Sequence, residues 1–297
     1  MDNDMKKVFE QCVKRWEKYG MDDRIEDAIN VFNTKWLNDE KIIEQKEIVL
    51  KLLKKFDYYS REEIHIAIEE LNEKLIEKFG VSDEDSIISI VKKKDGKYNS
   101  SVEYITEYRN LRSLNKNIFY TTLDELKIEW WKNIKKVVFV DDCSGTGTQF
   151  TDFLDRERKR RSYANKKIIL AVAIVIDSAV KHIKEYAKDN SLDIEIIWYC
   201  SKEKAYQSIS AEEKEKIYEL SKKRKINEKY IHGFKNAEAL IAFFSNTPND
   251  TIGIFWEKTE KNDPIFLREL DRKPGWQTNS MNKRKRKRRQ YESKCRR

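Results

Sequence analysis

The sequence of 297 residues lacks any long hydrophobic run. A membrane-spanning helix needs about 18 or more consecutive apolar residues, and no stretch approaches that length. Acidic rather than basic residues follow Met1, unlike a secretory leader. We therefore expect no membrane span, no secretion and a cytoplasmic protein.

Paired cysteines and clustered histidines are also missing. The four cysteines lie far apart and form no Cys-x-x-Cys pair, which predicts free thiols in a reducing cytoplasm. The three histidines share no metal-ligand spacing with the cysteines or with one another. This argues against a structural zinc site, and we expect no metal held directly by the protein.

An excess of one charge is absent from most of the chain. The net charge is +9, and residues 282–297 alone hold ten Lys or Arg and one Glu. The other 281 residues hold 51 basic and 51 acidic side chains. A run of like charge is usually disordered and often contacts nucleic acid. We therefore expect contact with nucleic acid or an acidic partner, and a purely solubilising role is the alternative. The residues of this basic run are Lys283, Arg284, Lys285, Arg286, Lys287, Arg288 and Arg289.

Hydrophobic periodicity predicts a helical region followed by an α/β domain. Apolar residues recur at helical spacing through residues 1–80, where Ser60 and Glu63 form a capping box and Gly80 ends a helix. From residue 85, short apolar runs alternate with helical patterns, which predicts a mostly parallel sheet flanked by helices. We expect a helical region at 1–84, an α/β domain at 85–281 and a disordered basic tail at 282–297.

Residues 137–149, with the sequence VVFVDDCSGTGTQ, are the most informative segment. Four apolar residues predict a buried parallel strand, and ligands of open α/β sheets bind at the carboxyl ends of such strands. Asp141 and Asp142 can accept hydrogen bonds from sugar hydroxyls. The glycines that follow allow backbone N–H groups to approach an anion. The segment predicts a sugar-phosphate site, and a solvated strand end is the alternative.

Three common phosphate loops do not fit this segment. A Walker loop requires a lysine, and none occurs here. A dinucleotide fingerprint that begins at Gly145 would need glycine where Phe150 stands. Phosphatases of the haloacid-dehalogenase type need a second aspartate at the position of Cys143.

The segment instead resembles the ribose-phosphate signature of type I phosphoribosyltransferases. The resemblance implies that Asp141 and Asp142 bind the ribose hydroxyls of phosphoribosyl pyrophosphate. It also implies that the turn, above all Thr146, Gly147 and Thr148, binds the 5′-phosphate. A Mg²⁺ ion would be carried by the pyrophosphate. The predicted phosphate-binding residues are Ser144, Gly145, Thr146, Gly147 and Thr148.

Two positions depart from that signature. Gly145 stands where purine-salvage members carry an aspartate that can act as a base, and Gln149 replaces a small hydroxyl residue. No carboxylate lies inside the turn, and the resemblance makes Asp141 and Asp142 the candidate catalytic residues. Catalysis would then resemble that of members which stabilise an oxocarbenium-like state rather than abstract a proton.

A closer resemblance extends from about residue 45 to about residue 260. It rests on residues 56–60 (FDYYS), on residues 139–147 and on NTPNDT at 246–251 ahead of 254–256. Together these resemble the phosphoribosyltransferase-like effectors of bacterial conflict systems, including effectors encoded beside retron reverse transcriptases. The resemblance implies a toxin-like antiphage effector in an oligomer or complex, held inactive by partners such as a reverse transcriptase with its RNA and DNA.

Two further sets of residues are candidates for ligand contacts. The resemblance to type I phosphoribosyltransferases implies that a loop after an early strand contacts pyrophosphate, and its counterpart here contains Lys97, Ser100 and Ser101. These residues precede a predicted helix, whose positive end favours anions; an ordinary polar loop is the alternative. Asn246 and Asn249 lie between two late apolar runs that predict strands, at residues 239–244 and 252–256. These asparagines could read a nucleobase edge or simply build a turn.

Two hypotheses follow from the sequence. In the first, the chain is a phosphoribosyltransferase-like effector that acts on phosphoribosyl pyrophosphate or on a nucleotide bearing ribose phosphate. In the second, the pocket is a degenerate sensor, and the chain binds nucleic acid or a reverse transcriptase through its tail and helical region.

Overall fold

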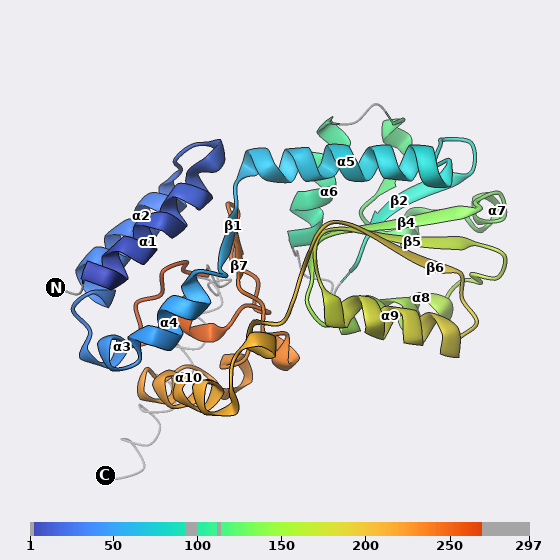
Figure 1. Ribbon diagram of the computed structural model, residues 1–297. Coiled ribbons are helices and arrows are strands. Elements are labelled where there is room, and N and C mark those ends of the chain that lie inside the picture. The colour runs from blue at the N-terminus through green and yellow to red at the C-terminus, as the bar shows by residue number, and fades with distance from the viewer. Residues whose placement is uncertain (1–2, 93–99, 112–113, 269–297) are drawn as a thin grey trace, which may run out of the picture.

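A five-stranded parallel sheet forms the centre of one lobe of the computed structural model (Figure 1), which describes residues 3–92, 100–111 and 114–268. The strand order is β3-β2-β4-β5-β6. The strands are β2 (Ser86–Ile90), β3 (Phe119–Tyr120), β4 (Lys136–Ser144), β5 (Lys167–Ile176) and β6 (Ile194–Lys202). The prediction of an α/β fold with a mostly parallel sheet is confirmed.

Helices cover both faces of this sheet, which explains why its strands are continuous apolar runs. One face packs against α5 (Arg61–Phe79) and α6 (Ser100–Leu111). The other packs against α8 (Thr148–Arg158) and α9 (Asp177–Asp189). In β5, every residue after Lys167 is buried.

The predicted start and end of α5 are confirmed. The Ser60 hydroxyl accepts a hydrogen bond from the backbone N–H of Glu63 at 3.2 Å, as an N-cap does. Gly80 follows the helix in the left-handed conformation, with φ of 60°, which glycine adopts without steric cost.

The second lobe combines both ends of the described chain (Figure 1). Its N-terminal helices share one hydrophobic core with residues from the segment 205–266. The helices of this lobe are α1 (Asn3–Trp16), α2 (Asp23–Val31), α3 (Glu40–Glu44), α4 (Lys46–Leu53) and α10 (Ala211–Lys223).

Aromatic contacts hold this shared core together. Phe9 stacks on Phe32 with ring centroids 3.7 Å apart, and Phe56 stacks on Phe266 at 5.2 Å. Trp16 packs edge-on against Phe266 at 5.0 Å. Residues on both sides of the predicted boundary at residue 84 therefore belong to one core.

Two local predictions are wrong. Residues 57–59 fall in the region predicted to be helical, but they form the strand β1 (Asp57–Tyr59), which pairs in parallel with β7 (Ile241–Phe243). Three residues are too few to show a period, and their partner is remote in sequence. Residues 252–256 do not form a strand but a 3₁₀ turn, η8 (Gly253–Phe255). The Trp256 indole N–H, bonded to the Thr251 carbonyl at 2.6 Å, fixes this turn.

Short helical segments complete the fold. They are η1 (Glu17–Tyr19), the π-helix η2 (Phe32–Trp36), η3 (Lys116–Ile118), η4 (Leu123–Glu125), α7 (Ile128–Trp131), η5 (Ala205–Ser208), η6 (Glu228–Tyr230) and η7 (Phe234–Asn236).

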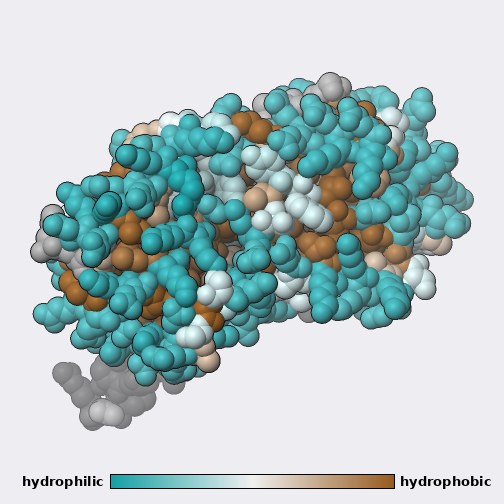
Figure 2. All heavy atoms as spheres, viewed as in Figure 1, coloured by the Kyte–Doolittle hydropathy of each residue, from teal (hydrophilic) through white to brown (hydrophobic). Residues whose placement is uncertain are grey.

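Polar side chains cover most of the face seen in Figure 2, with hydrophobic patches between them on both lobes. Among the described helices, none has the length and apolar character needed to cross a bilayer. Cys12, Cys143 and Cys200 are free thiols, as predicted, and Cys295 lies outside the described residues.

Candidate functional site

The two predicted sugar-binding acids lie at the carboxyl end of the central strand β4, beneath the start of α6. Asp141 is only 5% exposed, whereas Asp142 is partly exposed. The Ser101 hydroxyl donates to Asp141 at 2.7 Å, and the Ser100 hydroxyl donates to Asp142 at 3.0 Å. The carboxylates thus already accept hydrogen bonds from hydroxyls, and these belong to the protein itself.

Burial makes it unfavourable to ionise Asp141 beside Asp142. Loss of solvent, together with the neighbouring charge of Asp142, raises the pKa of Asp141 well above its usual value. The Ser101 hydroxyl and the backbone N–H of Asp142, at 3.0 Å, oppose that rise because they stabilise the ionised form. Burial and the carboxylates of Asp250 and Asp142 likewise raise the pKa of Cys143.

The predicted phosphate loop connects β4 to the first turn of α8. Gly147 directly precedes the helix with φ of 76°, and a Cβ there would lie 2.9 Å from Ile183 Cγ1, so only glycine fits. The hydroxyls of Thr146 and Thr148 lie 2.8 Å apart, and both residues are partly exposed. The loop therefore presents two hydroxyls beside a helix N-terminus, where an anion is favoured.

The other lobe contributes two charged residues that the sequence did not predict. Lys235 Nζ donates to the Thr148 hydroxyl at 3.1 Å. The Asp250 carboxylate lies against Gly145 so closely that a Cβ on this glycine would be 2.3 Å from Asp250 Oδ2. Asp250 lies within the NTPNDT segment that carried the family resemblance, which was the only sequence signal for it. Lys235 had none.

A cavity of about 370 Å³ opens beside Asp142. Burial, followed by the charges of Asp142 and Glu107, raises the pKa of Glu103 in its wall. Aromatic and carboxylate side chains dominate the lining, which is formed by Arg61, Ile64, Ser100, Glu103, Tyr104, Glu107, Asp142, Phe243, Phe244 and Ser245.

The remaining predicted residues are placed as follows. The Asn246 side-chain oxygen accepts from the Thr247 N–H at 2.8 Å, as in a turn, and Asn246 directly follows the cavity residue Ser245. The Asn249 carbonyl accepts from the Phe234 N–H at 2.8 Å. Lys97 and the basic run at 283–289 lie outside the described residues.

Comparison with known proteins identifies the family. A family model described as PRTase-CE matches residues 33–268. The chain belongs to the PRTase-CE family. This family is phosphoribosyltransferase-like and occurs in conflict systems, which confirms that part of the predicted resemblance.

One solved structure similar to this PRTase-CE chain is the Helicobacter pylori xanthine-guanine-hypoxanthine phosphoribosyltransferase. The two share 13% sequence identity, and the match covers 51% of this chain and 91% of the other with a TM-score of 0.32. No curated protein matches the chain.

The implied Mg²⁺ ion has no preformed carboxylate cage in the described part of this PRTase-CE protein. No group of three or more His, Cys, Asp or Glu side chains there is arranged to hold a metal ion.

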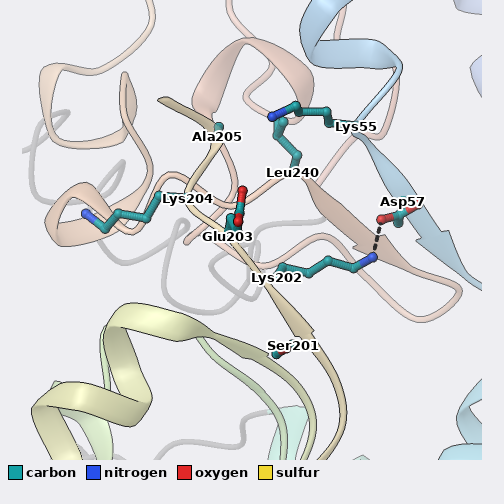
Figure 3. A pocket seen from close by; sticks show the side chains of 8 residues that line it. All are labelled: Lys55, Asp57, Ser201, Lys202, Glu203, Lys204, Ala205 and Leu240. Atoms are coloured by element: carbon teal, nitrogen blue, oxygen red, sulfur yellow. Dashed lines mark ion pairs between the residues drawn. The ribbon is translucent and has the colours of Figure 1, made fainter. Parts of the chain in front are cut away.

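A second cavity, of about 280 Å³, lies where β6 passes into the other lobe (Figure 3). Three lysines border it, but each is engaged. Lys202 pairs with Asp57 at 2.7 Å, and Lys55 donates to the Ser208 hydroxyl. Lys204, which points away from Asp57 in Figure 3, donates to the Asn236 carbonyl at 2.7 Å. This cavity is therefore not a preformed anion site.

Proposed function

We propose that this PRTase-CE chain binds phosphoribosyl pyrophosphate or a nucleotide bearing ribose phosphate as the toxin component of an antiphage system such as a retron. In the reaction the bond from the ribose C1′ to pyrophosphate or to the base breaks, that group leaves, and C1′ forms a new bond to an acceptor nucleophile (transfer) or to water (hydrolysis). The observation that carries this proposal is the pairing of Asp141 and Asp142 with a glycine-containing loop at the end of the central strand. Membership of the phosphoribosyltransferase-like PRTase-CE family supports this general class of chemistry.

Each part of the site has a chemical role in this proposal. The acid pair accepts hydrogen bonds from the ribose hydroxyls, and the loop with the start of α8 binds the phosphate. As the glycosidic bond breaks, positive charge develops on the sugar, and the fixed carboxylates stabilise it. A Mg²⁺ ion on the pyrophosphate would neutralise the leaving group.

The contacts of Ser100 and Ser101 indicate how the sugar would enter. Their hydroxyls occupy the carboxylate positions that the ribose hydroxyls would take. Binding therefore exchanges one pair of hydroxyls for another, so the acid pair stays hydrogen-bonded throughout. The released serine hydroxyls then face the side from which the pyrophosphate is predicted to bind.

Calorimetric titration with phosphoribosyl pyrophosphate and Mg²⁺ tests this proposal. We expect Asp141→Asn/Asp142→Asn to weaken binding at least about tenfold, because hydrogen bonds to charged groups contribute roughly 1.5–3 kcal/mol each. Asp27→Asn, at an exposed position on α2, is the matched control and should bind like wild type. Equal binding by the double variant and the wild type would refute the site.

Asp141 and Asp142 accept hydrogen bonds from the protein's own serine hydroxyls. This observation also favours a second candidate function. In that alternative the pocket is a catalytically degenerate nucleotide sensor, and the basic tail binds nucleic acid or a reverse transcriptase. Cell toxicity separates the two. Toxicity that survives the Asp141→Asn/Asp142→Asn change but is lost on truncation at Asn282 supports the sensor, and the reverse pattern supports the enzyme.

A further inference from the structure

We propose that Lys235 is the cation that binds the phosphate group of the ligand, so that the second lobe completes the phosphate site. This inference rests on the proposed function and adds to it a residue from outside the predicted loop. Lys235 Nζ lies 3.1 Å from the Thr148 hydroxyl, which in turn lies 2.8 Å from the Thr146 hydroxyl. One ammonium and two hydroxyls thus converge at the start of α8.

The Lys235 ammonium is available for a ligand. Its side chain is 46% exposed, and its ion pair with Asp152 is long, at 3.8 Å, with an acid that is 64% exposed. Surface pairs of this kind contribute little to stability. A phosphate bound at the two threonine hydroxyls could therefore replace Asp152 as the partner of the Lys235 ammonium, with little loss of free energy.

The backbone that presents Lys235 is strained. Lys235, Asn236 and Glu238 have φ values of 52°, 58° and 55°, in the left-handed region that side chains other than glycine rarely adopt. Lysine gains no local hydrogen bond there, unlike asparagine. Strain of this kind persists where surrounding contacts enforce it, and it concentrates at functional sites.

Several contacts enforce this strained turn. The Glu238 N–H bonds to the His232 carbonyl at 2.9 Å, and the Glu238 carbonyl accepts from the Ala205 N–H at 2.8 Å. Lys204, which lines the second cavity (Figure 3), also donates to the Asn236 carbonyl at 2.7 Å. The turn is thus built into the lobe, which fixes the position from which Lys235 reaches α8.

Two glycines allow close packing around Asp250: Gly145 where the lobes meet, and Gly233 within the second lobe. A Cβ on Gly145 would lie 2.3 Å from Asp250 Oδ2, and a Cβ on Gly233 would lie 2.0 Å from the Asp250 carbonyl oxygen. Asp250 places negative charge on the Gly145 flank of the loop, which disfavours an anion there. The phosphate is therefore directed to the opposite flank, where Thr146, Thr148 and Lys235 lie.

The test uses Lys235→Gly in the full chain, because glycine suits a φ of 52° and removes only the side chain. Titration with ribose 5-phosphate should show affinity reduced about tenfold or more, the size expected for a lost charge-assisted hydrogen bond. The melting temperature should be unchanged or higher because the backbone strain is relieved. Binding of inorganic pyrophosphate, predicted to occupy the Ser100 side, should not change.

Matched variants make the outcome decisive. Lys235→Arg keeps the charge and should retain most of the affinity, and Lys184→Ala, at an exposed position on α9, should behave as wild type. If Lys235→Gly binds ribose 5-phosphate like wild type while Asp141→Asn/Asp142→Asn does not, the role of Lys235 is refuted and the proposed function stands. If neither variant loses affinity, or wild type does not bind, the proposed function itself fails.

Discussion

Burial of the Asp141 carboxyl lowers the stability of the folded protein, but it places a hydrogen-bond acceptor at the candidate binding site. It is 5% exposed, and its pKa is raised by burial and by the charge of Asp142. A folded protein that keeps such a group loses stability at neutral pH, since the unfolded chain ionises more easily. Stability given up at a binding site is a common cost of function.

This reasoning predicts that Asp141→Asn stabilises the protein at high pH. Below the unfolded aspartate pKa of about 3.9 both states keep the proton; as pH rises, the unfolded state ionises first and wild-type stability falls. Asparagine keeps an oxygen for the Ser101 and Asp142 donors. We expect the free energy of unfolding of the variant to exceed that of wild type at pH 8, and the difference to shrink towards pH 4.

Urea unfolding of both proteins between pH 4 and pH 8 measures this difference. Asp27→Asn, which replaces an exposed aspartate on α2, is the matched control. An Asp141→Asn variant that is less stable than wild type at every pH would contradict the account.

At the residue scale, the sequence predicted the acid pair and the loop because strand, turn and helix are contiguous there. It could not predict Lys235, which lies 87 residues from its partner Thr148. It also missed that Ser100 and Ser101 contact the acids themselves, because their position depends on how α6 packs on β4. Contacts between remote segments leave no periodic signal in a single sequence.

At the scale of elements, apolar runs predicted strands correctly at β5 and at β7, which lies within the run 239–244, but they missed β1 and wrongly predicted a strand at 252–256. β5 is buried on both faces, so its sequence alone identifies it. β1 and β7 pair over only three residues each, and their pairing depends on the second lobe. Residues 252–256 are as apolar as a strand, but they are buried as a 3₁₀ turn, η8 (Gly253–Phe255), which a hydrophobic pattern cannot distinguish.

The packing of Asp250 on the phosphate loop predicts a strong coupling between two substitutions. Gly145→Ala should cost roughly 1–3 kcal/mol, the usual size for overpacking, because its Cβ would meet Asp250 Oδ2 at 2.3 Å. Asp250→Ala removes the two closest atoms, Oδ2 and Cγ, and leaves the Cβ at 2.9 Å, so it should recover part of that cost. Urea unfolding of wild type, both single variants and the double variant measures the interaction free energy.

Gly20→Ala is the control for that cycle. Gly20 has φ of 110° but nothing within 4 Å of an added Cβ, so this change strains the backbone without a clash. Its cost should add to that of Asp250→Ala within about 0.5 kcal/mol. If Gly145→Ala and Asp250→Ala were additive to the same degree, the two segments would not be in contact as described.

At the scale of the whole molecule, the two lobes meet at the candidate site. The sheet lobe supplies the acid pair and the loop, and the other lobe supplies Lys235 and Asp250. Because that lobe is built from both ends of the chain, the N-terminal helices support the same unit that carries these residues. The family match over residues 33–268 includes the acid pair, the loop, Lys235 and Asp250, and it begins after α1 and α2.

The charge distribution predicts that nucleic-acid binding, where it occurs, depends on the tail. Truncation before Asn282 removes the whole net charge of +9. The truncation should lower the affinity for DNA or RNA. It should also make the affinity less dependent on salt, because the logarithm of the binding constant falls with the logarithm of the salt concentration with a slope of about −0.9 for each duplex phosphate contacted. Filter binding at several salt concentrations measures both quantities, and a truncated chain that retains full affinity would contradict the prediction. Its titration with phosphoribosyl pyrophosphate should match that of the full chain.

The most direct test of the central claim is a crystal structure of the protein soaked with phosphoribosyl pyrophosphate and Mg²⁺. The account predicts ribose hydroxyls on Asp141 and Asp142 in place of the serine hydroxyls, with the 5′-phosphate on Thr146, Thr148 and Lys235. Saturating ligand with Ser100 and Ser101 still bound to both acids, and no phosphate at the loop, would contradict it.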